Sequence, residues 1–228
     1  MGNLLKVLRT QVDPLNVVAR SHDIALWSRV SGYQLAYLDH LLYHARHFFD
    51  YGGCLCIYPM TELPFWRLPM RCRQQEARRA DFAATHRTLL DEVRTQLRLR
   101  GPLGNRDFVG QRVNNYRGGK DTALALYYLW LTGELMIHHR QGFERVYDFR
   151  EHIAPPAVDY AAPDEEAEHF FARKTVAFKG LITAREWVNG FSGYIQRRIS
   201  RAEAQQWLQA MMQQGELAAV EVEGSKEC

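Results

Sequence analysis

Apolar residues recur mostly at helical spacing along this chain. In the first fifty residues they fall three or four positions apart in short runs, which are broken by polar residues at 21–23 and by a Ser-Gly pair at 31–32. This spacing predicts short amphipathic helices. Between Tyr51 and Tyr58 a compact apolar run predicts a strand. We therefore expect an N-terminal winged-helix-like unit over residues 1–60.

The best-defined pattern lies in residues 81–150. An amphipathic helix opens this stretch, a short helix is expected near Phe108, and a third helix is predicted over 121–133. Two further segments, 134–140 and 143–149, flank a Gln-Gly pair and predict a β-hairpin. Three helices followed by a hairpin indicate a winged helix-turn-helix.

The middle unit recurs in the last part of the chain. The matching segments are Arg100-Gly101-Pro102-Leu103 with Lys179-Gly180-Leu181-Ile182, offset by 79 residues, and Gly133-Glu134-Leu135 with Gly215-Glu216-Leu217, offset by 82 residues. A length difference confined to a loop is typical of tandem homologous modules, while chance likeness of amphipathic helices is the alternative. We expect an incomplete third winged helix over 165–228, with a strand at 217–222 that has no return strand.

Two stretches are interpreted as connections between these units. Residues 61–80 are rich in arginine and proline, and residues 151–164 are rich in proline and alanine. Such composition is typical of linkers. The expected fold class is α+β, mainly helical, with tandem winged helix-turn-helix units and small β-hairpin wings.

Charge is spread unevenly along the 228 residues. The net charge is +3, yet residues 66–112 hold eleven arginines and five acidic residues. Such a segment suits contact with a phosphate backbone, although a solvated helix face is the alternative.

Other features of the composition argue against membrane and metal. The longest apolar run, at 123–131, is far shorter than the roughly 20 residues of a membrane span, and no signal-peptide pattern is present, so we expect a cytoplasmic protein. Cys54 and Cys56 lack the usual zinc-ligand spacing, so we expect no metal.

Candidate chemistry is concentrated in Gln11-Val12-Asp13-Pro14, which holds an amide and a carboxylate two positions apart. Pro14 disfavours a helical conformation at Asp13, so Asp13 can cap the following helix. From the spacing alone, a helix cap and a catalytic carboxylate both remain open.

The wider sequence resembles the bacterial AlkZ-like DNA glycosylases. The likeness extends along nearly the whole chain and is carried by Gln11-Val12-Asp13, 16–21, 26–30, Gly32-Tyr33, Phe49-Asp50-Tyr51, Pro59 and, most specifically, Gly142-Phe143-Glu144-Arg145-Val146-Tyr147-Asp148. It implies winged-helix enzymes that remove alkylated purines from DNA and unhook interstrand cross-links, with Gln11 and Asp13 as the catalytic pair and no cofactor. Against the family pattern the chain looks shortened at both ends, and it departs from that pattern at Gly52-Gly53-Cys54 and Asn114-Asn115-Tyr116.

Hydrolysis of an N-glycosidic bond passes through an oxocarbenium-like state, so it needs an anion beside the sugar and a positioned water. On this reading Asp13 supplies the anion or activates the water, and Gln11 orients that water. Residues expected near DNA phosphates are Arg20, His22, Arg29, Lys120, His138, His139, Arg140 and Arg145.

The partner expected on this reading is damaged double-stranded DNA, bound by a monomer, with self-pairing through residues 217–222 as the alternative. A second functional interpretation stays open. The chain can be a non-catalytic winged-helix DNA-binding protein, such as a regulator or an inactive fragment, in which Asp13 only caps a helix. A dimeric regulator binds palindromic sites, whereas a glycosylase binds DNA with little sequence preference.

Overall fold

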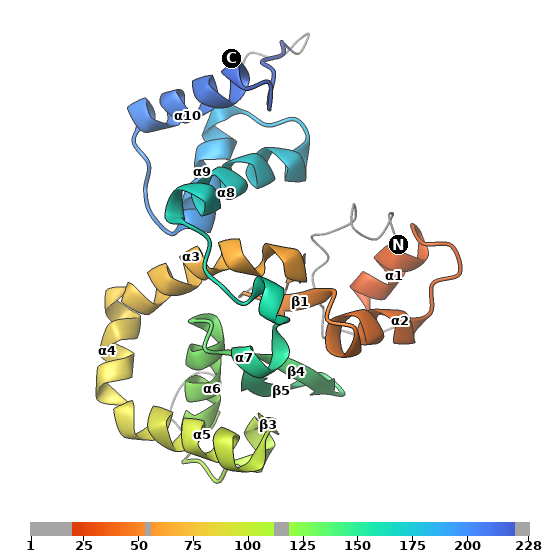
Figure 1. Ribbon diagram of the computed structural model, residues 1–228, viewed down its shortest axis with the longest axis vertical. Coiled ribbons are helices and arrows are strands. Elements are labelled where there is room, and N and C mark those ends of the chain that lie inside the picture. The colour runs from red at the N-terminus through yellow and green to blue at the C-terminus, as the bar shows by residue number, and fades with distance from the viewer. Residues whose placement is uncertain (1–19, 53–55, 112–118, 222–228) are drawn as a thin grey trace.

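The computed structural model describes residues 20–52, 56–111 and 119–221. Its elements form three groups around one central helix, α3 (Leu63–Gln75), as Figure 1 shows. In that view α1 and α2 lie to the right of α3, α4 to α6 with the larger sheet lie below it, and α8 to α10 lie above it.

The N-terminal group combines short helices with a two-stranded hairpin. Its elements are α1 (Ser21–Trp27), α2 (Leu35–Asp39), a π-helical turn (His40–His44), β1 (Phe48–Tyr51) and β2 (Cys56–Pro59). The expected single strand from Tyr51 to Tyr58 is therefore wrong, because β1 and β2 pair antiparallel. The chain turns after β1 at Gly52, whose φ of 85° suits glycine.

Residues 61–80, expected to connect two units, are mostly helical. They contain the whole of α3 and the start of α4 (Ala77–Thr85). Pro64 lies in the first turn of α3, where no backbone N–H is needed, and Pro69 lies inside the helix. An interior proline costs about 3 kcal/mol. Burial of large side chains such as Trp66 and Met70 on the same helix offsets this cost.

The middle group matches its predicted elements closely. It comprises α5 (Arg87–Arg100), β3 (Leu103–Gly104), a 3-10 turn (Asn105–Asp107), α6 (Asp121–Leu131), β4 (Leu135–Gln141) and β5 (Glu144–Phe149). The strands form one antiparallel sheet in the order β3-β5-β4. The α+β, mainly helical fold class is confirmed, and this arrangement is compatible with a winged helix.

The last group begins after a compact linker. The remaining elements are α7 (Arg150–Ile153), a 3-10 turn (Pro156–Val158), α8 (Asp164–Lys179), α9 (Ala184–Ile195) and α10 (Arg201–Gln213). Residues 217–221 are not in a strand. The expected strand is wrong for this stretch, because the described residues supply no second strand to pair with it.

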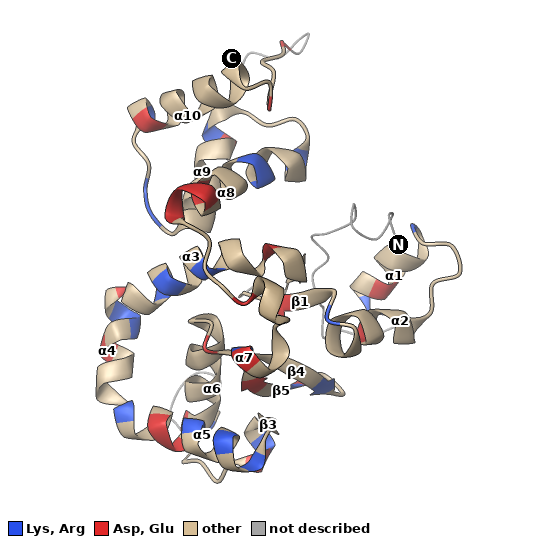
Figure 2. Ribbon diagram, viewed as in Figure 1, with Lys and Arg blue, Asp and Glu red and all other residues tan. Residues whose placement is uncertain are grey.

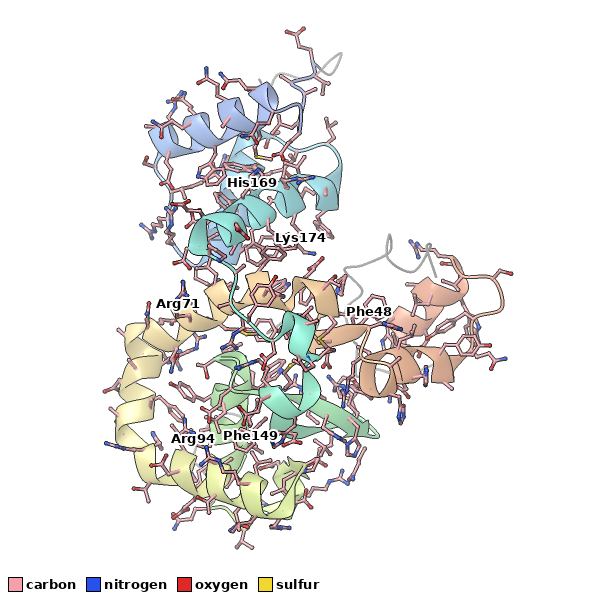
Figure 3. The ribbon with its side chains drawn as sticks, viewed as in Figure 1. Phe48, Arg71, Arg94, Phe149, His169 and Lys174 are labelled. Atoms are coloured by element: carbon pink, nitrogen blue, oxygen red, sulfur yellow. The ribbon has the colours of Figure 1, made fainter. Side chains whose placement is uncertain are left out.

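The middle and last groups each contain an ion pair between an arginine and a glutamate at equivalent positions. Arg94 on α5 pairs through two nitrogens with Glu134, at 2.6 and 2.7 Å. Seventy-nine residues later, Arg173 on α8 pairs with Glu216 at 3.4 Å, and His169 contacts the same carboxylate at 2.9 Å. Figure 3 labels Arg94 on α5 and His169 on α8. The equivalent positions support two copies of one module.

Two hydrophobic cores hold these groups. The larger core runs continuously through α3, α6, α8 and α9, and includes Leu63, Trp130, Phe171 and Trp187. The smaller core lies in the N-terminal group and includes Leu26, Leu38, Leu42, Phe48 and Ile57. The strands of the N-terminal group face both cores, since Phe49, Tyr51 and Tyr58 belong to the larger core while Phe48 and Ile57 belong to the smaller.

Candidate nucleic-acid interface

The expected catalytic residues, Gln11 and Asp13, lie outside the described residues. The described chain begins at Arg20, seven residues after Asp13 (20 minus 13). The site is therefore described from Arg20 onward, by the residues around Arg20 and the groove beside the β4–β5 hairpin.

An open groove of about 550 Å³ lies between the N-terminal end of α6 and the β4–β5 hairpin. Its lining combines cationic and aromatic side chains, including Asn105, Lys120, Tyr127, Arg140, Phe143 and Arg145. Cations suit phosphate oxygens, and aromatic rings suit the faces of bases. The groove therefore has the chemistry of a nucleic-acid interface.

Lys120 and Arg145 occupy opposite walls of this groove. The Lys120 ammonium donates to the backbone oxygens of Phe108, at 2.7 Å, and Asn105, at 3.4 Å, so it also fastens the loop that leads into α6. The half-buried Arg145 guanidinium lies 4.5 Å from the centroid of the Trp130 ring. A guanidinium that lies over an aromatic ring still presents N–H donors along its own edge, where a phosphate can meet them.

Arg140 lines the groove but is fully engaged by protein groups. Its side chain is 6% exposed and pairs with Asp50 of β1, which is 2% exposed. It also donates to the Tyr43 hydroxyl and to the Phe143 backbone oxygen, each at 3.0 Å. Burial alone would lower the pKa of Arg140, but Asp50 and Tyr43 together raise it. These contacts favour a structural role for Arg140.

Arg20 and His22 lie on the same side of the molecule as the hairpin tip. The Arg20 guanidinium lies 5.5 Å from the centroid of the Phe143 ring. His22 is 4% exposed, and its Nε2 lies 3.6 Å from a carboxylate oxygen of Asp23. Burial lowers the pKa of His22, and Asp23 opposes this shift. A buried, neutral imidazole packs inside the unit and is not a free cation for DNA.

The other expected contacts lie away from the groove lining. The exposed Arg29 donates to the backbone oxygen of Ala25 at 3.0 Å. His138 and His139 face each other with their Nδ1 atoms 2.9 Å apart. Burial lowers the pKa of His138, and the nearby cation of Arg46 lowers it further. The structure thus places Lys120, Arg140 and Arg145 in the groove lining and Arg20 beside Phe143, and it leaves Arg29, His138 and His139 outside that lining.

Sequence reasoning missed the side chains that attach the N-terminal group to the hairpin. Asp50, Tyr43 and Arg46 do this, and Arg46 donates to the backbone oxygens of Ile137 at 3.3 Å and His138 at 3.0 Å. One signal was available, because an aspartate in the apolar run Phe-Phe-Asp-Tyr needs a buried partner. For Arg46, whose backbone is left-handed with φ of 54°, no sequence signal indicated its role.

Several arginines of the basic segment are also structural. Arg67 donates to the backbone oxygen of Gly133 at 2.8 Å, and Arg73 donates to the Tyr51 hydroxyl at 2.7 Å. Figure 2 shows cations spread along α3, α4 and α5 and interspersed with acidic residues. Arg78 and Arg87 are exposed on α4 and α5 and remain candidates for phosphate contact.

Two further properties concern the described part of the chain. No helix there is both long enough and apolar enough to cross a bilayer. Within the same residues, no group of three or more His, Cys, Asp or Glu side chains is placed to hold a metal ion.

Comparison with known proteins identifies the family. No solved structure matches the chain. A family model described as DNA glycosylase AlkZ-like matches residues 5–228, a range that contains Gln11 and Asp13 as well as every residue of the groove. This family acts in DNA repair and makes DNA the partner of the chain. Because the match spans nearly the whole sequence, the protein belongs to the AlkZ-like DNA glycosylase family.

Proposed function

We propose that this protein hydrolyses the N-glycosidic bond of N7-alkylated purines in double-stranded DNA, including those in interstrand cross-links. The observation that carries the proposal is the family match over residues 5–228, which includes the amide and carboxylate of Gln11 and Asp13. The protein acts as a monomer in the cytoplasm, at the bacterial nucleoid, and uses neither metal nor organic cofactor.

The proposed chemistry needs few groups. An N7-alkylated purine carries a positive charge, so it leaves with the bonding electrons as a neutral base. Water forms the new bond to C1′ and loses a proton. Asp13 stabilises the developing oxocarbenium ion or accepts that proton, and the amide of Gln11 orients the water.

The proposed DNA surface is the groove between α6 and the hairpin. Arg145 and Lys120 attract phosphates there, and Tyr127 presents a ring. Covalent geometry limits the reach of the catalytic segment, since an extended chain spans at most about 3.6 Å per residue. Asp13 therefore lies within about 25 Å of Arg20, which itself contacts Phe143 in the groove wall.

Duplex DNA carrying a single N7-methylguanine tests the proposal. We expect the protein to release the free base, Asp13→Ala to abolish release, and Gln11→Ala to reduce it strongly. Val12→Ala is the matched control, because it leaves both polar groups in place. Removal of a helix cap alone costs about 1 kcal/mol, so the unfolding midpoint of each variant is measured beside its activity.

The competing function, a regulator, gives a different binding result. A glycosylase binds random duplexes about equally well, with affinity that falls steeply as salt rises. Strong preference for one palindrome, with no base release from the alkylated duplex, would establish the regulator instead.

A further inference from the structure

Phe143 lies at the tip of the β4–β5 hairpin, directly after Gly142, whose φ of 63° makes the turn. Two guanidinium groups lie against its half-buried ring. The Cζ atom of Arg140 is 4.8 Å from the ring centroid, and the Cζ atom of Arg20 is 5.5 Å from it. Each contact lies within the range of a cation–π interaction.

The two cations belong to different parts of the fold. Arg140 is on β4 of the middle group, whereas Arg20 is the N-cap residue of α1 in the N-terminal group. The Nε atom of Arg20 is buried and has no hydrogen-bond partner within the described residues. The Phe143 ring is therefore a principal contact that holds this guanidinium.

Behind the ring, the Arg140 contact is rigid. Its guanidinium is fixed by Asp50 on β1 and by the Tyr43 hydroxyl, and the same guanidinium donates to the Phe143 backbone oxygen. Phe143 also packs against the smaller hydrophobic core. The hairpin tip is thus joined to the N-terminal group on both sides, while its ring still lines the groove.

We propose that Phe143 is a positioning residue, whose ring holds Arg20 and so fixes the entry of α1 relative to the DNA in the groove. The inference rests on the proposed function, because Arg20 follows the Gln11-Val12-Asp13 motif closely in the chain. Loss of the ring removes a contact that holds Arg20 and so loosens the start of α1. A displacement of about 1 Å in a reacting group can cost about a hundredfold in rate.

The test separates chemistry from binding. Phe143→Leu keeps an apolar side chain and the backbone oxygen that Arg140 uses, but it removes the ring. At saturating enzyme we expect single-turnover release of N7-methylguanine to slow by about tenfold or more, with the dissociation constant for the duplex changed by less than about twofold. Phe143→Tyr keeps the ring and should keep the parental rate.

A matched control is Tyr160→Leu, which removes an exposed aromatic ring from the linker and should leave the rate unchanged. If Phe143→Leu released base at the parental rate once saturated, the ring would be at most a DNA contact and the inference would be overturned. The same conclusion follows if Phe143→Tyr is as slow as Phe143→Leu.

Hydrogen exchange gives a readout that does not depend on catalysis. In Phe143→Leu, amides of residues 21–27 should exchange faster than in the parent, while those of α8 stay unchanged. Equal exchange of residues 21–27 in both proteins would overturn the inference, even if the parent protein released no base. Failure of the proposed function and failure of the positioning role are therefore distinguishable.

Discussion

The buried ion pair between Asp50 and Arg140 is the contact whose loss should damage the fold most at the hairpin. Its two side chains are 2% and 6% exposed, so solvent screens them little. Asp50→Ala leaves the Arg140 cation buried without its partner. Breaking a buried pair in this way costs about 3–5 kcal/mol of the free energy of unfolding.

A second ion pair in the same protein is the matched comparison. Arg94 and Glu134 have good two-point geometry, but their side chains are 26% and 34% exposed. Exposure reduces the worth of such a pair to about 1 kcal/mol. Arg94→Leu, which keeps the apolar packing, should therefore destabilise the protein about threefold less than Asp50→Ala.

The assay is urea unfolding followed by amide exchange of residues 35–51, which reports on the N-terminal group directly. The double variant Asp50→Leu with Arg140→Met replaces both charges by apolar groups and should recover most of the loss, because no unpaired charge remains. If Asp50→Ala cost no more stability than Arg94→Leu, or if the double variant were no more stable than Asp50→Ala, the buried pair would not be what attaches the N-terminal group to the hairpin.

Three further results are expected. Arg145→Gln should weaken duplex binding and lower the slope of log affinity against log salt by about 0.9, whereas Arg140→Gln should leave the slope unchanged; fluorescence anisotropy over a salt series checks both. Burial holds the pKa of His22 and His138 below the unfolded value of 6.5, so the unfolded state takes up protons first as the pH falls. The contribution of these histidines to the free energy of unfolding, measured by urea unfolding, should be constant well above pH 6.5 and fall below it by up to about 1.4 kcal/mol per pH unit for each, and His22→Gln should flatten the curve. On α9, Gly190→Ala places a Cβ 2.7 Å from the Thr175 methyl group and should cost about 1–3 kcal/mol, while the open Gly193→Ala should stabilise by up to about 1 kcal/mol; thermal unfolding of the two variants compares them, and equal midpoints would contradict the packing.

Local patterns predicted the middle group well, because its two α-helices and the β4–β5 hairpin are long enough to carry their own periodicity. The helix near 121–133 and the hairpin around Gln141-Gly142 appear almost as expected. The helices over 61–80 were not foreseen, because local proline rules take no account of the burial of Trp66 in the larger core. A strand at 217–222 failed for a related reason, since strands depend on partners that a local pattern does not supply.

The candidate site divides in the same way. Chain patterns indicated Lys120 and Arg145 as DNA contacts, which stays a prediction, and both side chains line the groove. They could not show that Arg140 is bound by Asp50, ninety residues away in the chain. Nor could they show that His22 is buried. Such long-range pairings are fixed by tertiary packing. From the sequence alone, an arginine in the β4–β5 hairpin looks the same whether its guanidinium is solvent-exposed or paired with a distant carboxylate.

The most direct test of the central claim is the single-turnover rate of N7-methylguanine release from duplex DNA by the parent chain and by Asp13→Asn. Asparagine can still cap a helix, so this variant removes the negative charge and keeps the local structure. We predict release by the parent and a rate about a hundredfold or more lower in Asp13→Asn, with unchanged unfolding and DNA affinity. Release at the parental rate by Asp13→Asn would contradict the catalytic role of Asp13.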